Sequence, residues 1–382
     1  MWRDTMSKDQ FLVKDCLKLG FGLMRLPREG GDMNRPVDLE QMKKMVDDFL
    51  AAGGKYFDTA FIYEGSEEAA KATLCSRHPR DTYYLATKLN AASFCCSNEQ
   101  DAKAELKKSL ERTGAGYFDF YLLHGLDQEN LADYDKYGLW DYLKSVREEG
   151  LIRHMGFSFH DSPELLDRIL AEHPEAEFVQ LQINYADWDD GVVQSKGCYE
   201  IAAKYGKPII VMEPVKGGSL ANPPKPVEDI LKAADPDVSA ASWAVRFAAS
   251  LPGVMIVLSG MSSTEQMQDN LSYMKEFKPL SEEETNVVEH AREALHKIDQ
   301  IPCTSCHYCA AGCPVNMHIP EIFNVMNVYK LYGDLDRSKG DYTWRPGGPK
   351  ASECVRCGQC EDACPQHLPI ISLLEEVAET LE

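Results

Sequence analysis

The chain lacks any long uninterrupted run of apolar residues, and its opening residues, MWRDTMSKDQFLVKD, contain no apolar core. A membrane-spanning helix needs about 20 such residues and a signal peptide about 7 to 15, so neither is expected. Basic residues are also scarce, because 61 acidic residues outnumber 40 basic ones and give a net charge of −21. A nucleic-acid backbone or an anionic membrane surface would repel such a chain. We therefore expect a cytoplasmic protein with neither a nucleic-acid nor a membrane partner.

The apolar residues, 44% of the total, fall into short runs separated by helical patterns. Near-continuous apolar strands that alternate with helices are typical of a parallel sheet covered on its outer face. A length of 382 residues suits a barrel of typical size, about 250 residues, with an addition. Strands are expected at residues 19–25, 55–58, 83–88, 118–124, 155–159, 179–184, 209–213 and 255–260.

Ionisable side chains stand where three successive strands are expected to end. These are Asp58, Lys88 and His124, and Tyr63 lies in the loop after the first of these strands. In a (β/α)8 barrel the carboxyl ends of the strands converge on one face, where such barrels build active sites. A buried carboxylate needs a partner, because an unpaired buried charge costs several kcal/mol. Each residue alone would more often be structural, but the four together in these positions favour catalysis.

These residues and several short motifs resemble the aldo-keto reductase family. The motifs run from Leu19 to Leu271 and read GFGLMRLP, FDTAFIYEGSEE, ATK, YLLHG, GFSFH, QLQIN and LSGMSSTEQMQDNL. The resemblance implies a (β/α)8 TIM barrel that interconverts a carbonyl and an alcohol with a nicotinamide cofactor. It implies Tyr63 as the general acid and Lys88 as the residue that lowers the pKa of Tyr63. Asp58 would orient Lys88, and His124 would donate a second hydrogen bond to the substrate oxygen.

The resemblance also implies where the cofactor binds. Ser158 and Gln182 would hydrogen-bond the nicotinamide carboxamide, and the loop from Pro214 to Leu220 would approach the pyrophosphate. No G-x-G-x-x-G follows the first strand, in agreement with a barrel that binds nicotinamide without a Rossmann domain. The full set of implied contacts is Ser158, Gln182, Met212, Pro214, Gly217, Gly218, Leu220, Ser259, Gly260, Gln266 and Asn270.

Some positions depart from the family pattern. Phe159 stands where the family often has Asn, and Met212 stands where it often has a Tyr that stacks on the nicotinamide ring. Members that prefer NADP carry Lys and Arg against the 2′-phosphate, at positions that here are Gly260 and Gln266. Without these cations the charge-assisted contacts to a phosphate are lost, so NAD(H) is expected to bind at least as well as NADP(H).

The cysteines near the end of the chain form a repeated motif, C-x2-C-x2-C-x3-C-P, which is typical of two-cluster ferredoxins. In those proteins the last cysteine of each run ligates the other cluster. We assign one 4Fe-4S cluster to Cys303, Cys306, Cys309 and Cys364, and a second to Cys354, Cys357, Cys360 and Cys313. Disulfides are not expected in a cytoplasm that keeps thiols reduced, and zinc sites use cysteine pairs instead.

Helical patterns at 319–332 and 370–381 indicate a mostly helical ferredoxin-like domain, and residues 336–350 are expected to form a surface loop. Ser281 and Glu284 form a capping box that opens a connecting helix. The expected order is therefore a barrel over residues 1–280, a connecting helix over 281–302 and the iron-sulfur domain over 303–382.

Three functions remain open from the sequence. The first is a nicotinamide-dependent carbonyl reductase or alcohol dehydrogenase, with clusters that exchange electrons with a ferredoxin or flavodoxin-like carrier or only brace the chain. The second is an iron-sulfur oxidoreductase that reduces a substrate with ferredoxin-type electrons. This alternative arises because clusters move single electrons whereas nicotinamide moves a hydride. The third is a non-catalytic, nucleotide-binding redox sensor.

Overall fold

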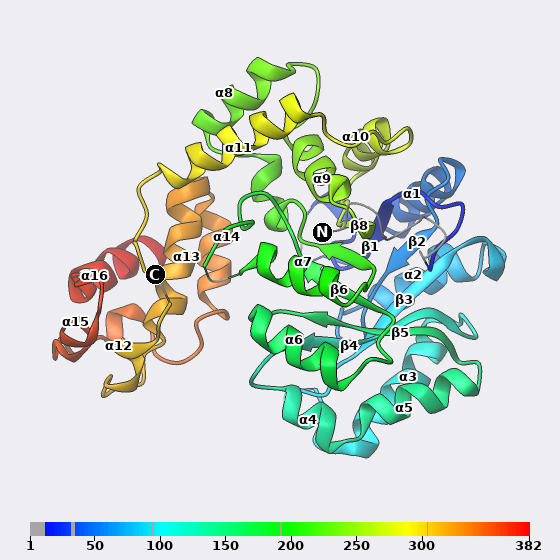
Figure 1. Ribbon diagram of the computed structural model, residues 1–382, viewed down its shortest axis with the longest axis horizontal. Helices are drawn as coiled ribbons and strands as arrows, with labels where there is room; N and C mark the ends of the chain where they lie inside the picture. Colours follow the sequence, from blue (N-terminus) through cyan, green and yellow to red (C-terminus); the bar gives the residue numbers. More distant parts are fainter. Residues whose placement is uncertain (1–11, 32–34, 93–94, 192, 304) are drawn as a thin grey trace. The chain divides into compact units, whose positions relative to one another are not determined.

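A computed structural model describes residues 12–31, 35–92, 95–191, 193–303 and 305–382. Within these residues eight parallel strands, β1 to β8, close into a barrel in sequence order (Figure 1). Each strand pairs with the next, and β1 pairs with β8. The predicted (β/α)8 barrel is therefore confirmed. The strands are β1 (Leu19–Gly22), β2 (Tyr56–Asp58), β3 (Tyr84–Leu89), β4 (Phe118–Leu126), β5 (Ile152–Phe159), β6 (Phe178–Gln182), β7 (Ile209–Met212) and β8 (Val254–Ser259).

Helices lie between the strands in the described part of the barrel, and several of them begin at a residue whose side chain caps the first turn. Asp38 accepts a hydrogen bond from the backbone N–H of Gln41, as an N-cap residue does. Ser162 caps α6 in the same way, with Pro163 in the first turn. The helices of the barrel are α1 (Leu39–Ala51), α2 (Ser66–Ala70), α3 (Glu99–Thr113), α4 (Leu131–Lys136), α5 (Leu139–Glu148), α6 (Pro163–Glu172), α7 (Ser195–Lys204), α9 (Ala240–Ser250) and α10 (Thr264–Met274).

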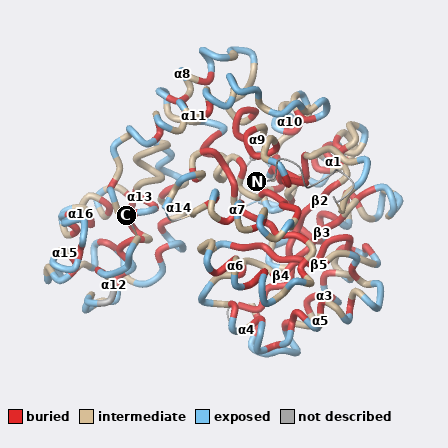
Figure 2. The backbone as a smooth tube through the Cα atoms, viewed as in Figure 1, coloured by how far each residue is buried: buried red, intermediate tan, exposed pale blue. Residues whose placement is uncertain are grey.

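The strands carry the core of the barrel, and buried residues follow them along most of their length (Figure 2). Phe21, Phe49 and Phe57 are fully buried and pack with ring centroids 5.4–6.0 Å apart. Such burial stabilises each ring by roughly 1.5–3 kcal/mol relative to an exposed one. The barrel is thus a packed scaffold that holds the ends of its strands in fixed positions.

Contacts within the chain define a second compact unit, formed by Asn222–Pro236 and Asn286–Glu382. It includes residues 222–236, which the sequence analysis placed within the barrel. Its helices are α8 (Lys225–Ala234), most of α11 (Glu282–His296), α12 (Tyr308–Ala311), α13 (Ile319–Tyr332), α14 (Leu335–Tyr342), α15 (Gln359–Ala363) and α16 (Ile370–Leu381).

The core of this unit is built from α13, α16 and the cysteine runs. Phe323, Met326, Leu374 and Val377 are buried in it together with Cys360. The helices expected at 319–332 and 370–381 are present with those bounds. The prediction of a surface loop at residues 336–350 is partly wrong. Helix α14 occupies the first half of this segment, and its last residue, Tyr342, is buried. No helix among the described residues is long and apolar enough to cross a bilayer.

Candidate functional site

A buried ion pair joins the ends of β2 and β3. The ammonium of Lys88 is fully buried and lies 2.5 Å from Oδ1 of Asp58 and 2.8 Å from the carbonyl oxygen of Thr59. Burial alone would lower the pKa of Lys88, but Asp58 and Tyr63 outweigh it and raise that pKa above its ordinary value. Lys88 therefore remains an ammonium with its charge held at the carboxyl end of the barrel.

Tyr63 lies in the loop between β2 and α2, against both Lys88 and His124. The Lys88 ammonium is 5.1 Å from the centroid of the Tyr63 ring, and the ring meets that of His124 edge-on at 5.6 Å. Burial raises the pKa of Tyr63, while the charge of Lys88 acts in the opposite direction. The expectation that Lys88 brings this pKa below its ordinary value is therefore not met, and the phenol keeps its proton at neutral pH.

His124 stands near the end of β4, which continues to Leu126, two residues beyond the predicted end. Burial, and then the charge of Lys88, lower the pKa of His124 well below its ordinary value, so its imidazole is neutral. Its Nδ1 atom is buried and has no hydrogen-bond partner within the described residues. The backbone carbonyl of His124 accepts a 2.6 Å hydrogen bond from the hydroxyl of Tyr134, which fixes the strand end.

The two residues expected at the nicotinamide carboxamide lie at the ends of adjacent strands. Ser158 on β5 is buried, and its hydroxyl oxygen accepts a 2.7 Å hydrogen bond from the backbone N–H of Gly125. Gln182 ends β6 and donates from Nε2 to Asp187 at 3.1 Å. Ser158 thus keeps its O–H to donate, and Gln182 keeps its carbonyl oxygen to accept.

A cavity of about 140 Å³ lies at the carboxyl ends of β5 and β6. Its lining combines polar side chains with an apolar wall and comprises Phe159, His160, Asp161, Leu181, Gln182, Val193 and Cys198. Phe159, where the family often has Asn, therefore contributes apolar surface here. Met212, at the end of β7, accepts a 3.5 Å hydrogen bond on its sulfur from Nε2 of Gln180.

The loop after β7 has an unusual backbone. Gly217 and Gly218 have φ values of 62° and 104°, in the region that favours glycine. The short helical segment η5 (Lys216–Ala221) follows Pro214, and Leu220 is fully buried within it. Leu220 is therefore a core residue, whereas Gly217 and Gly218 are partly exposed.

The end of β8 and the start of α10 hold the remaining predicted residues. Asn270 donates to Ser259 at 2.6 Å, and both side chains are buried. Gln266 accepts a 2.7 Å hydrogen bond from the backbone N–H of Ser262. A Cβ on Gly260 would lie 3.6–3.9 Å from side-chain carbons of Arg25. Sequence reasoning missed this arginine, because it lies more than 200 residues away in the chain and becomes a neighbour only when β1 pairs with β8.

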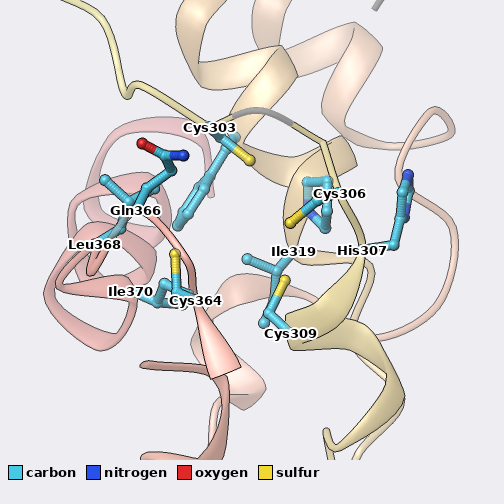
Figure 3. A pocket seen from close by; sticks show the side chains of 11 residues that line it. Cys303, Cys306, His307, Cys309, Ile319, Cys364, Gln366, Leu368 and Ile370 are labelled. Atoms are coloured by element: carbon cyan, nitrogen blue, oxygen red, sulfur yellow. The ribbon is translucent and has the colours of Figure 1, made fainter. Parts of the chain in front are cut away.

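The cysteine runs form separate cavities in the second unit. Cys303, Cys306, Cys309 and Cys364 line one cavity, and their sulfur atoms point toward a common space (Figure 3). Cys313, Cys354, Cys357 and Cys360 line another. Ile319 lines both cavities, so they are neighbours. The structure thus brings the fourth cysteine of each run to the first three of the other run.

The backbone of the two runs repeats as closely as the sequence does. Ser305 and Arg356, two residues after the first cysteine of each run, have φ values of 51° and 57°. The same left-handed conformation recurs at His307 and Gly358, and at Asn316 and His367. Non-glycine residues adopt this conformation rarely, and successive N–H groups in such turns form concave anion-binding sites. The repeated strain therefore indicates that both runs are shaped around similar anionic groups.

The donor atoms of the two cavities are those of an iron-sulfur cluster. Among the described residues, no group of three or more His, Cys, Asp or Glu side chains is arranged to hold a single metal ion. Four cysteines that line one cavity are the ligand set of an iron-sulfur cube. Thr304, between Cys303 and Cys306, lies outside the described residues.

Comparison with known proteins gives two family matches. The model of the aldo/keto reductase family matches residues 18–293, and that of a 4Fe-4S dicluster domain matches residues 302–368. The aldo-keto reductase str7 of Strobilurus tenacellus is 28% identical over 229 residues, which cover 59% of this chain and 65% of that protein. An aldo-keto reductase of Mycolicibacterium vanbaalenii is 30% identical over 223 residues, covering 58% of this chain and 74% of that protein.

Some matches are shorter, and two mycobacterial relatives are covered over only 39% and 36% of their length. Among solved structures, the holo form of aldo-keto reductase AKR11C1 from Bacillus halodurans has a TM-score of 0.56 and 23% identity. This match covers 72% of the chain and 91% of that structure. A Klebsiella pneumoniae aldo-keto reductase in complex with NADPH has a TM-score of 0.54 and 19% identity, over 71% of the chain and 89% of that structure. These likenesses support the barrel fold.

Proposed function

This chain belongs to the aldo/keto reductase family, and we propose that it interconverts a carbonyl compound and an alcohol with NAD(P)(H) at the mouth of the barrel. The observation that carries the proposal is the buried Lys88–Asp58 pair beside Tyr63 and His124. A charged lysine costs several kcal/mol to bury. Packing alone would not require a charged lysine at this position. Its location beside the phenol of Tyr63 and near the imidazole of His124 is instead explained by a catalytic role.

Tyr63 acts as the general acid when a carbonyl is reduced. Because burial raises the pKa of Tyr63, the phenol carries its proton at neutral pH and can donate it to the substrate oxygen. As the proton leaves, the Lys88 ammonium stabilises the phenolate that forms. Asp58 keeps Lys88 in place and charged. In the reverse direction the phenolate accepts the proton of the alcohol.

His124 orients the substrate. Its lowered pKa leaves one ring nitrogen protonated and the other free. A neutral imidazole can donate one hydrogen bond to the substrate oxygen without competing with Tyr63 as a proton source. Tyr63 and His124, whose rings are in contact, would therefore both hydrogen-bond the same substrate oxygen.

Ser158 and Gln182 would hold the cofactor by its carboxamide. A primary carboxamide offers one acceptor and one N–H donor group, and the free O–H of Ser158 and free carbonyl oxygen of Gln182 complement both. A bound nicotinamide cofactor would supply the hydride. The backbone at Gly217 and Gly218 would approach its pyrophosphate, and Ser259, Gly260, Gln266 and Asn270 would contact its adenosine end.

Steady-state assays of aldehydes and ketones with NADH and NADPH test this proposal. Turnover of at least one class of carbonyl is expected, with oxidation of the nucleotide. Tight nucleotide binding without turnover of any aldehyde, ketone or alcohol would instead favour a redox sensor. Such an outcome would remove the catalytic proposal.

We predict that NADH binds at least as tightly as NADPH, because Gly260 and Gln266 replace two cations and leave Arg25 as the nearby guanidinium. Titration of both nucleotides by quenching of protein fluorescence measures the two dissociation constants. A preference of tenfold or more for NADPH, about 1.4 kcal/mol, would contradict the prediction. Arg25→Met then shows whether this arginine supplies the missing contact, and Arg28→Met serves as its neighbouring control.

The two cysteine cavities would hold two 4Fe-4S clusters that pass single electrons to or from a ferredoxin or flavodoxin-like carrier. Their sulfur donors, repeated backbone and shared wall at Ile319 support two adjacent clusters. Neighbouring clusters can form a relay, whereas a structural brace would need only one. Since clusters carry single electrons and nicotinamide carries a hydride, reduction of the substrate by cluster electrons is the competing function.

The crossed ligand sets predict a specific pattern of iron loss. Wild-type protein, purified without oxygen, should contain about eight iron atoms per chain, and a single cysteine variant about four. Cys313→Ala combined with Cys357→Ala removes two ligands of one cluster and should still leave about four. Cys313→Ala combined with Cys306→Ala should leave almost none. If ligation followed sequence order, the last two results would be exchanged.

A further inference from the structure

Asp187 is the centre of a hydrogen-bonded network beside the barrel mouth. It lies in the loop between β6 and α7 and is only 3% exposed. Its Oδ2 accepts hydrogen bonds from Gln182 at 3.1 Å and from Asn184 at 2.8 Å, and its Oδ1 forms an ion pair with Lys216. One carboxylate thus joins the end of β6 to the loop after β7.

Asp187 determines which way the side-chain amide of Gln182 faces. A carboxylate paired with an ammonium can only accept hydrogen bonds. The atom of Gln182 that faces Asp187 must therefore be the NH2 group, and the carbonyl oxygen must face away from Asp187. No described residue donates a hydrogen bond to that oxygen, while Gln182 lines the cavity at the barrel mouth. An oxygen fixed in this way is an acceptor that remains available to a ligand.

Asn184 strengthens the same arrangement. It donates to Asp187 and to the backbone carbonyl of Glu213, at 2.8 and 3.2 Å, and accepts from the backbone N–H of Asp187 at 2.9 Å. Its hydrogen bonds are thus made within the network. The side-chain carbonyl oxygen of Gln182, by contrast, accepts no hydrogen bond from the described residues. Gln182 therefore differs from Asn184, whose hydrogen bonds only stabilise the loop.

Lys216 connects this network to the glycine loop. Glu213 and Lys216 have φ values of 57° and 49°, and Gly217 and Gly218 follow with positive φ as well. Non-glycine residues in this region cost of order 1–3 kcal/mol each, so the loop needs contacts that hold it. The ion pair to Asp187 is such a contact.

We propose that Asp187 is a positioning residue that fixes the amide of Gln182, so that its carbonyl oxygen accepts the N–H of the cofactor's carboxamide. The inference rests on the proposed function, in which Gln182 faces the nicotinamide. Asp187 itself touches neither cofactor nor substrate in this arrangement. Through Lys216 it also holds the loop that approaches the pyrophosphate.

The 3-acetylpyridine analogue of NAD tests this role, because it keeps the carbonyl oxygen of the carboxamide but lacks its NH2 group. Dissociation constants for NAD+ and the analogue are measured by calorimetry on the full chain. Wild type is expected to bind the analogue about 5- to 10-fold more weakly, as one lost hydrogen bond implies. In Asp187→Asn, Gln182 can turn its amide either way, so this ratio should fall toward one.

Matched variants distinguish a loss of the Gln182 orientation from a general disturbance of the binding site. Gln182→Ala should also bring the ratio toward one. Lys216→Met should weaken the binding of both nucleotides while keeping the wild-type ratio, because it disturbs the loop and not Gln182. Asp189→Asn, the same change on a partly exposed residue of the same loop, should alter neither constant. Asp187→Ser replaces Asp187→Asn if the latter does not fold.

The outcomes are distinguishable. The inference would be overturned if the Asp187 variants kept the same ratio of dissociation constants for the analogue and NAD+ as the wild type. It would also be overturned if the wild-type protein bound both nucleotides with nearly equal dissociation constants. Failure of the wild-type protein to bind NAD+, NADH or NADPH at all would instead overturn the proposed function.

Discussion

Tyr63→Phe is expected to lower kcat for carbonyl reduction by about 10²- to 10⁴-fold, the usual contribution of a general acid. The change removes one hydroxyl and leaves the ring that packs against His124 and Lys88. Nucleotide affinity should therefore change little. Single-turnover rates with saturating nucleotide and substrate measure the effect on the chemical step.

Tyr142→Phe is the matched control for this variant. Tyr142 lies on α5 and its hydroxyl donates to the backbone carbonyl of Lys103 at 2.8 Å, within the helical layer. Its loss should leave kcat unchanged. If Tyr63→Phe retained kcat within a few fold of wild type, the assignment of Tyr63 as the proton donor would be wrong.

Lys88→Met is expected to be the most destabilising single change in the site. It leaves the carboxylate of Asp58, which is 3% exposed, without its cation. Breaking a buried pair by removing one partner costs about 3–5 kcal/mol. Urea unfolding, followed by circular dichroism, should show the barrel transition at a clearly lower midpoint, and carbonyl reduction should be lost as well.

The double variant Asp58→Asn, Lys88→Met is the control, because it removes both charges. It should recover much of the lost stability but none of the activity. A single variant as stable as the double one would show that the pair is not electrostatically coupled. The pKa of Lys88 is raised above its ordinary value, and burial raises the pKa of Asp58. The ion pair should therefore be lost as pH rises through the raised pKa of Lys88, and also at acid pH once Asp58 takes up a proton.

The barrel could be predicted from the sequence because its signal is local and repeated. Each short apolar strand is followed by a helical pattern, and the eight strands lie at or near the positions expected for them. The positions of Asp58, Lys88 and His124 followed in turn, because parallel strands in a barrel end on one face. The cysteine spacing is also a local signal. The cavities bring together the same sets of four cysteines that the spacing assigned to each cluster.

The remaining features depend on contacts between segments that the sequence does not show to be neighbours. Arg25 lies beside Gly260 only because the barrel closes, and Asp187 meets Lys216 only because two loops lie side by side. The direction in which the pKa of Tyr63 shifts could not be predicted from the sequence, because burial raises that pKa and the charge of Lys88 lowers it. Helix α14 was missed because glycine and charged residues mask its short pattern, while its burial depends on Tyr342 packing in the second unit.

The most direct test of the account is the fate of a deuterium on the transferring position of the nicotinamide. Protein purified without oxygen is mixed with NADH or NADPH in which both hydrogens at C4 are deuterium, together with a panel of aldehydes and ketones, and the products are analysed by mass spectrometry. Hydride transfer at the Tyr63 site predicts an alcohol with one deuterium bound to the former carbonyl carbon. An alcohol formed without deuterium, with its new hydrogen taken from solvent, would contradict direct transfer and favour reduction by electrons from the clusters.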